Sequence, residues 1–206
     1  MIPALHRLQT VPLLSHVTQK EWRRFLDLAP AHTYRPGNIL FYQGNLPLGL
    51  HFISGGRVKL IKEDRAGRCQ IMRIVQGPDL LGDRAFFAER PYMCSGVVME
   101  ESLISFLQPA HFWDIFGKNP QTLRLLAQRF AVELGRAEDY RHCISVCTIN
   151  ARMATRLLKS SKRPEHAGSP KGEFVLTETR TELAQVLGTT PEAVSRTLAK
   201  LCSKGL

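Results

Sequence analysis

The stretch TRTELAQVLGTTPEAVSRTLAKL, which begins at Thr179, constrains the fold most, because it predicts two short helices joined by a tight turn. Thr179 and Glu182 have the spacing of a capping box, in which each side chain satisfies a free backbone N–H group. Gly188 stands where the turn needs a residue that tolerates positive φ. Thr190 can cap the second helix, with Pro191 at its first position. The stretch therefore predicts a helical hairpin with a defined corner.

The apolar residues of this hairpin follow the pattern of a helix-turn-helix. Ala184 is a small residue where the two helices would cross, and Val194 would hold the second helix against the first. The second helix then presents polar side chains, and Arg, Glu and Ser can all bond to base edges in the major groove. The residues expected to contact DNA are Glu192, Ser195, Arg196 and Lys200. The alternative is an ordinary helical hairpin whose polar face is only solvated.

Charge and composition limit the partners of the chain. The 206 residues have a formal net charge of +10, and from Arg141 onward there are 11 Lys/Arg against 5 Asp/Glu. This basic end contains the hairpin, so a polyanionic partner fits it. No apolar run is long enough to span a bilayer, and the N-terminus lacks the pattern of a signal peptide. We therefore expect a cytoplasmic protein without a membrane partner, with its five cysteines reduced.

Between residues 32 and 107 the apolar residues come in short runs separated by Gly and Pro. Such spacing predicts an antiparallel sandwich or barrel. The segment DRAGR, from Asp64, predicts a hairpin loop within it. Before the sandwich, Thr18 is the expected cap of an amphipathic helix, QKEWRRFLDL. Helices follow the sandwich, so the predicted fold class is α+β.

A long helix is predicted at residues 119–148, with apolar residues spaced alternately by four and three. This spacing is typical of a coiled-coil contact between two copies of a helix, although Gly135 weakens the helix by about 1 kcal/mol relative to Ala. The expected dimer seam is Leu123, Ala127, Phe130, Leu134, Ala137 and Ile144, interrupted by the polar Arg141 and Thr148. A dimer would place two reading helices one DNA turn apart, which suits a palindromic site. The alternative is a helix that packs only on its own sandwich.

The rest of the chain connects the long helix to the hairpin. Asn150 begins a further predicted helix, PEHAGSPKGE is a predicted loop, and residues 174–176 (FVL) are a predicted short strand. We expect three parts: residues 1–118, residues 119–148, and residues 149–206.

The order of sandwich, long helix and helix-turn-helix resembles the cyclic-AMP receptor protein and fumarate–nitrate regulator (CRP/FNR) family of bacterial transcription factors. The resemblance covers essentially the whole chain, through YRPG from Tyr34, FYQG from Phe41, FISGGRVK from Phe52, LGD from Leu81, and the hairpin. It implies an N-terminal β-roll that senses a signal, a helix that dimerises, and a C-terminal winged helix that binds a promoter. It also implies that the chain is not an enzyme.

The resemblance extends to the residues that would bind DNA. By position, Glu192, Ser195 and Arg196 match the family's base-reading set, and this form is similar to the fumarate–nitrate branch, which prefers TTGAT-like half-sites. Arg180 and Thr190 are expected backbone contacts, because helix starts favour phosphate. RNA polymerase is a possible further partner. The family's two-stranded wing does not follow the hairpin, so we expect a chain that is truncated before the wing.

The expected effector pocket departs from the family's cyclic-nucleotide pattern. Cyclic-nucleotide sensors of this family use Gly-Glu for the ribose and Arg-Ser or Arg-Thr for the phosphate. Here Gly82 is followed by Asp83, and Cys94 precedes Ser95. A Cys cannot replace the charged fork of an Arg. These four residues remain the candidate pocket, but we do not expect cyclic AMP, and the effector is left unidentified.

Other cofactors are less well defined by the sequence. The iron–sulfur branch of the family uses an N-terminal Cys cluster, whereas the first cysteine here is Cys69, so we do not expect such a cluster. Some relatives sense gases through haem, and the histidines in or beside the sensor are His32, His51 and His111. Cys143 and Cys147 share one face of the long helix, as a metal or redox site or as two small buried residues.

Two rival functions stay open from the residues alone. A metal-binding, cupin-like enzyme could have such a sandwich, although the chain has no His-x-His pair, no phosphate-cradling Gly-rich loop and no nucleophile elbow. A dimeric ligand-binding module could use the hairpin only for protein contacts.

Overall fold

A computed structural model describes residues 5–161 and 175–203 of the chain. The chain forms two compact units, Met1–Val132 and Glu133–Leu206. Within the described residues, no helix is long and apolar enough to cross a membrane. The loop expected at residues 164–173 lies outside the described residues.

Among the described residues, the helical segments η1 (Arg7–Thr10), η2 (Pro12–Leu14) and α2 (Gln19–Leu28) precede the first strand. Thr18 caps α2 as predicted, because its hydroxyl accepts a hydrogen bond from the Glu21 N–H at 3.2 Å. The Glu21 carboxylate accepts in return from the Thr18 N–H at 2.6 Å, which completes a capping box.

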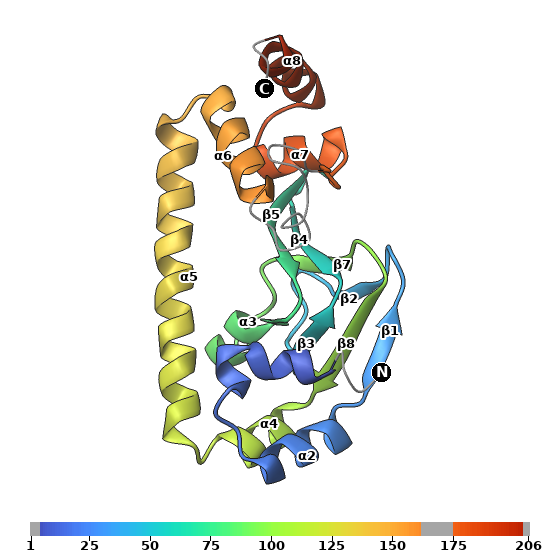
Figure 1. Ribbon diagram of the computed structural model, residues 1–206, viewed down its shortest axis with the longest axis vertical. Helices are drawn as coiled ribbons and strands as arrows, with labels where there is room; N and C mark the ends of the chain where they lie inside the picture. Colours follow the sequence, from blue (N-terminus) through green and yellow to red (C-terminus); the bar gives the residue numbers. More distant parts are fainter. Residues whose placement is uncertain (1–4, 162–174, 204–206) are drawn as a thin grey trace. The chain divides into compact units, whose positions relative to one another are not determined.

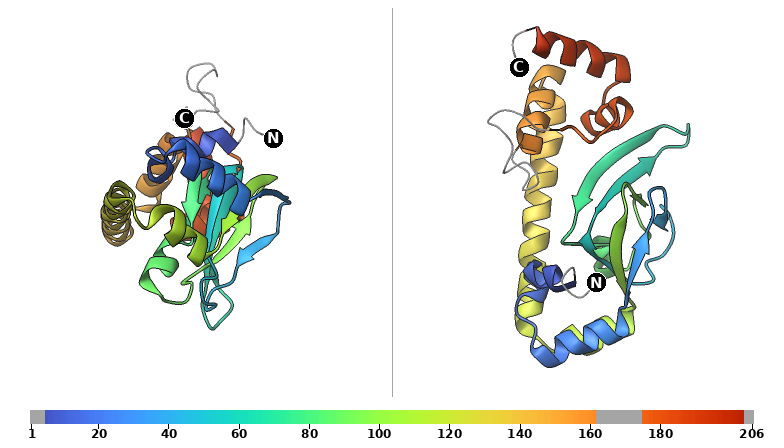
Figure 2. Two further views of the ribbon diagram at one scale, coloured as in Figure 1. Left: turned by 90° about the horizontal axis from the view of Figure 1, so that it is seen from below. Right: turned by 45° about the vertical axis from the view of Figure 1, so that its right-hand side comes forward.

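Eight strands form an antiparallel sandwich of two four-stranded sheets, which confirms the predicted fold class. In spatial order, the first sheet contains β1 (Ala31–Tyr34), β8 (Ser102–Leu107), β3 (Leu50–Gly55) and β6 (Asp79–Leu81). The second contains β2 (Ile39–Phe41), β7 (Ser95–Val98), β4 (Arg57–Glu63) and β5 (Cys69–Gln76). Figure 2 shows the β4–β5 hairpin as the longest arm of the sandwich.

The loop of this hairpin has the turn chemistry that the sequence predicts. Asp64 Oδ1 accepts hydrogen bonds from the Ala66 and Arg68 N–H groups at 2.9 and 3.0 Å. Gly67 has a φ of +75°, a conformation that a residue without a side chain adopts at little cost.

Two apolar cores stabilise the first unit. One lies between the sheets and contains Phe41, Ile53, Val58, Val75, Leu81, Ala85, Tyr92, Val98 and Ile104. The other lies at the end of the sandwich, where α2 and α4 (Pro109–Phe116) lie side by side (Figure 1). Its largest buried rings are Phe25, Phe52, Phe112 and Phe116.

The part of the chain that the structure describes also contains α3 (Asp83–Ala88), α5 (Pro120–Val146), α6 (Ile149–Ser161), α7 (Arg180–Leu187) and α8 (Pro191–Cys202). The long helix predicted at residues 119–148 is α5, and the division between the two units falls inside it. The core of the second unit contains Met153, Leu183, Ala184, Leu187 and Val194.

One local prediction fails before the hairpin. A strand was expected at residues 174–176, but Val175 and Leu176 belong to no strand, and residue 174 lies outside the described residues. Val175 is 70% exposed, whereas Leu176 packs against the core of the second unit.

Candidate nucleic-acid interface and effector site

The hairpin of α7 and α8 has the predicted caps. The Thr179 hydroxyl accepts from the Glu182 N–H at 3.2 Å, and the Glu182 carboxylate accepts from the Thr179 N–H at 3.0 Å. Gly188 follows α7 with a φ of +62°, in the left-handed region that glycine adopts most easily. The Thr190 hydroxyl then accepts from the Ala193 N–H at 3.3 Å at the start of α8.

Apolar packing fixes α8 on α7. Ala184 and Val194, predicted to lie at the crossing, are both buried, and Leu187 completes the contact. Leu198 and Leu201 pack against the same core from the next turns of α8. This face of α8 is thereby used for folding, which leaves its other face available to a partner.

The predicted DNA-contacting residues lie on or beside the free face. Glu192, Arg196 and Lys200 are exposed, whereas Ser195 is half-buried. Arg180 and Thr190, the expected phosphate contacts, are exposed at or just before the starts of α7 and α8.

A groove of about 280 Å³ separates α8 from the start of α6. Its lining residues are Thr148, Ile149, Asn150, Ala193, Arg196, Thr197 and Lys200. Two of the predicted DNA-contacting cations therefore border a hollow surface of the second unit.

The charges on α8 suit base recognition. The pKa of Glu192 lies below its ordinary value because the Glu192 carboxylate bonds to the Glu192 backbone N–H group and to the Thr190 hydroxyl. The positive charge of Arg196 lowers this pKa by a smaller amount. Glu192 is therefore an ionised hydrogen-bond acceptor at neutral pH. Arg196 follows it by one helical turn and can supply paired donors to guanine.

The candidate effector pocket begins at the corner between β6 and α3. Gly82 has a φ of +87°, and a Cβ built there would lie 3.4 Å from both the Gly49 carbonyl oxygen and Tyr92 Oη. Asp83 is the first residue of α3. Glycine is favoured at this position by its left-handed backbone conformation, since a Cβ would meet its neighbours at ordinary contact distances.

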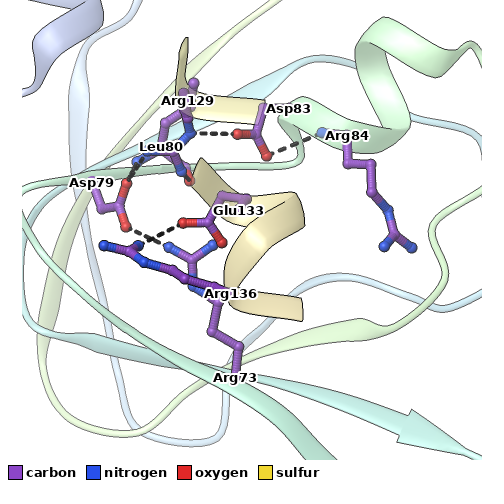
Figure 3. A network of polar contacts seen from close by, with 8 residues as sticks. All are labelled: Arg73, Asp79, Leu80, Asp83, Arg84, Arg129, Glu133 and Arg136. Atoms are coloured by element: carbon purple, nitrogen blue, oxygen red, sulfur yellow. Dashed lines mark hydrogen bonds and ion pairs between the residues drawn. The ribbon is translucent and has the colours of Figure 1, made fainter. Parts of the chain in front are cut away.

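Asp83 is engaged by an arginine of the long helix (Figure 3). Arg129 Nε donates to Asp83 Oδ2 at 2.6 Å, and Arg129 Nη1 donates to Asp79 Oδ1 at 2.7 Å. Its third nitrogen, Nη2, donates to the Leu80 carbonyl at 2.9 Å. Burial opposes the charge of Arg129, but the two carboxylates outweigh it and raise the pKa of its guanidinium.

The other two pocket residues have different surroundings. Ser95 Oγ accepts a hydrogen bond from the Gln43 N–H at 2.9 Å. Cys94 is half-buried, and desolvation raises the pKa of its thiol despite the positive charges of Arg84 and Lys62. The Cys94 thiol is therefore mostly neutral at pH 7 and provides no fixed charge for a phosphate.

An aromatic pair fills the interior of the sandwich next to Gly82. The rings of Phe41 and Tyr92 are stacked, with centroids 4.1 Å apart and planes inclined by 17°. Burial raises the pKa of Tyr92 to about 12. The sequence did not identify Tyr92 or Arg129 as neighbours of the pocket, because neither belongs to a local motif.

The three candidate histidines have different environments. His51 is buried in β3 between the rings of Phe41 and Phe106, at centroid distances of 5.5 and 4.8 Å. Burial lowers the pKa of His51 to about 4, so its imidazole is neutral at pH 7. His32 is exposed in β1 and His111 is half-buried in α4. Across residues 5–161 and 175–203, no group of three His, Cys, Asp or Glu could hold a metal ion.

Cys143 and Cys147 are neighbours at the end of α5. Cys143 lies in the last turn of the helix, Cys147 directly follows its last residue, Val146, and both cysteines are half-buried. A hydrogen bond with the Cys143 side chain raises the pKa of the Cys147 thiol. A redox or metal role for this pair stays a prediction.

Most of the predicted dimer seam is exposed in the single chain. Leu134 is 62% exposed, Leu123 45% and Ile144 36%, and Ala127 and Ala137 are also exposed. Phe130 differs, because it packs edge-on against Phe87 of its own unit, with centroids 5.7 Å apart. The seam therefore leaves an apolar surface that the single chain does not cover.

Two family models match the chain, a cyclic nucleotide-binding domain over residues 31–119 and a Crp-like helix-turn-helix domain over residues 151–206. The chain is 26% identical over 190 residues to the cAMP-activated global transcriptional regulator CRP of Salmonella typhimurium, covering 90% of this chain and 88% of the relative.

Solved structures show the same fold. The c-di-GMP responsive global regulator CLP of Xanthomonas campestris matches with a TM-score of 0.78 at 21% identity, over 92% of this chain and 94% of that chain. The catabolite activator protein of Thermus thermophilus matches with a TM-score of 0.57 at 25% identity, over 94% of this chain and 88% of that chain.

The environment of His51 predicts a loss of stability in acid. The unfolded chain binds a proton at His51 below about pH 6.5, whereas the folded chain does so only near pH 4. Stability from the neutral imidazole is therefore present above pH 6.5 and is lost as the pH falls toward 4. The first unit should be about 2 kcal/mol less stable at pH 5 than at pH 7 from this group alone. Urea unfolding followed by the fluorescence of Trp22 and Trp113 measures it, and His51→Phe should remove this part of the pH dependence.

The contacts of Arg129 predict a specific cost of removing its charge. Arg129→Gln leaves Asp79 and Asp83, whose side chains are 19% and 16% exposed, without their shared cation. The first unit should lose about 3 kcal/mol of unfolding free energy. The exposed Arg124→Gln, on the same helix, is the matched control and should change it by less than about 0.5 kcal/mol. Equal losses from the two variants would show that the network does not stabilise the unit.

Proposed function

Because the chain belongs to the CRP/FNR family of transcription regulators, we propose that it acts as a homodimer on a palindromic DNA site, controlled by a signal received in its β-roll. Family membership makes it a DNA-binding transcription regulator with an effector-binding domain, and not an enzyme. The cupin-like enzyme is thereby set aside.

The proposed division of labour follows the chain. Residues 1–118 form the sensor, residues 119–148 the dimerisation helix, and residues 149–206 the DNA-binding part. The protein is proposed to bind DNA in the cytoplasm, with RNA polymerase as a further partner.

The exposed polar face of α8 is the observation that carries the proposed DNA contacts. Arg196 would donate to a guanine edge, and Glu192 would accept from a cytosine amino group. Ser195 and Lys200 flank them on α8, and Arg180 and Thr190 would hold phosphates. A half-site similar to TTGAT is proposed from the Glu192-x-x-Ser195-Arg196 order.

The exposed seam of α5 supports the proposed dimer. Leu123, Leu134 and Ile144 would otherwise leave large apolar side chains in water. A second copy of the helix would bury them, at a gain of about 25 cal/mol for each Å² of apolar surface. Dimerisation would also provide the two reading helices that a palindromic site requires.

The proposed effector site contains Gly82, Asp83, Cys94 and Ser95, but these residues do not suit a cyclic nucleotide. The Asp83 carboxylate is already bonded to Arg129, and Cys94 supplies no charge for a phosphate. The remaining alternatives are another small molecule, a haem or a redox signal. An absorption spectrum and a mass spectrum of the native protein would separate them.

The proposed base contact makes a prediction about sequence preference. Arg196→Ala should weaken binding to the preferred duplex by about 1–3 kcal/mol and relax the preference at one guanine position. Arg180→Ala, at a proposed phosphate contact, should instead weaken binding to all duplexes alike. Fluorescence anisotropy with duplexes chosen by in vitro selection measures both. If Arg196→Ala lowers affinity equally on every sequence, Arg196 does not read bases.

The proposed seam makes a prediction about assembly. Leu134→Glu should shift the protein from dimer to monomer at micromolar concentration, because two carboxylates would then face each other across the seam. Val132→Glu is the control, since Val132 is 54% exposed on α5 but lies outside the seam. Sedimentation velocity measures the change, and a dimer that survives Leu134→Glu would place the interface elsewhere.

A further inference from the structure

The C-terminal end of α7 bonds to side chains from outside the hairpin. The last four carbonyl groups of a helix have no partner within it. Ala184 O accepts from the Thr189 N–H at 3.0 Å, within the turn itself. Two of the other three accept from outside the hairpin: Val186 O accepts from Tyr140 Oη at 3.2 Å, and Leu187 O accepts from Arg152 Nη1 at 2.7 Å.

These two donors come from the helices that precede the hairpin. Tyr140 belongs to α5, which carries the proposed dimer seam, and Arg152 belongs to the first turn of α6 (Figure 1). Both side chains are half-buried. One turn further along α6, Arg156 forms an ion pair with Glu178, whose side chain is fully buried immediately before the cap of α7. Both ends of α7 are therefore held by residues of the preceding helices.

We propose that Tyr140 and Arg152 are positioning residues for DNA recognition, which hold the carbonyl groups beside the Gly188 corner and so set the direction of α8. We name these two residues the carbonyl clamp. The inference rests on the proposed role of α8 in reading bases.

The geometry gives the clamp this role because α7 and α8 are joined with little freedom. Only three residues, Gly188 to Thr190, separate the clamped carbonyls from α8, and Val194 is fully buried against α7. A rotation of α7 would therefore rotate α8 as well, together with the Arg196 side chain. The C-terminal end of α7 is the negative end of the helix dipole, so the positive charge of Arg152 is stabilised there.

The clamp also offers a route by which α5 could act on α8. The Tyr140 hydroxyl moves with α5, and a hydrogen bond weakens steeply once its distance and angle leave a narrow range. A shift or rotation of the end of α5 would therefore strengthen or break the hydrogen bond between Tyr140 Oη and Val186 O.

The test compares the clamp with Arg196 in one double-mutant cycle. The probe is the duplex that the wild-type full chain enriches by in vitro selection, and the readout is its Kd by fluorescence anisotropy. Tyr140→Phe removes a single hydroxyl and should raise the Kd about fivefold, and Arg152→Gln should raise it about tenfold or more. In the Tyr140→Phe, Arg152→Gln background, the factor by which Arg196→Ala raises the Kd should be at least about threefold smaller than in the wild type. The reason is that Arg196 is no longer held in the direction of the base.

Three further variants separate positioning from stability. Arg152→Lys keeps a charged donor and should recover most of the lost affinity. Tyr42→Phe, at an exposed tyrosine, and Lys159→Gln, at an exposed cation of α6, should leave the Kd within about twofold. Circular dichroism should show thermal midpoints of the clamp variants within a few degrees of the wild type.

The outcomes separate the two hypotheses. Additive effects of the clamp and Arg196, or affinity losses that merely follow the thermal midpoints, overturn the clamp and leave the proposed function intact. If Arg196→Ala changes the Kd for no duplex, both the proposed base reading and the clamp are overturned. A reduced effect of Arg196→Ala in the clamp variants, with normal stability, supports both.

Discussion

The left-handed corner at Gly188 is the constraint on which the functional half of the molecule depends. Glycine adopts the left-handed conformation found here, with a φ of +62°, at less cost than a residue with a side chain, so it favours this sharp turn. The corner brings Val194 into the core that Ala184 and Leu187 begin, and this burial leaves only one face of α8 free. The exposure of Arg196 is a consequence of this packing, and so is the direction in which its side chain can reach.

Features encoded by neighbouring residues could be predicted from the sequence. The caps at Thr18, Thr179 and Thr190, the turn at Asp64 and the corner at Gly188 each need only residues within a few positions of one another. The period of apolar residues likewise predicted the sandwich and the length of α5. The family resemblance added an expected function for each part, and the DNA-contacting role of α8 is a proposal.

Contacts between distant residues could not be predicted in the same way. Arg129 reaches carboxylates about fifty positions earlier in the chain, and Tyr140 reaches a carbonyl 46 positions later. From the sequence alone, an arginine on a helix surface or a tyrosine beside a seam could bond to many different residues. Only the fold shows which partners lie close. The same holds for Tyr92, whose ring fills the space beside Gly82 although its sequence neighbours give no sign of it.

The position of Arg129 also bears on how this protein could be recombined with a relative. Arg129 is part of α5 along the chain, but its three bonding partners and the compact unit to which it belongs lie on the sandwich side. A hybrid joined at the start of the long helix would inherit the guanidinium from one parent and the acids from the other. A junction after Val132 keeps donor and acceptors from a single parent, so a graft of the sensor should include the first half of the helix.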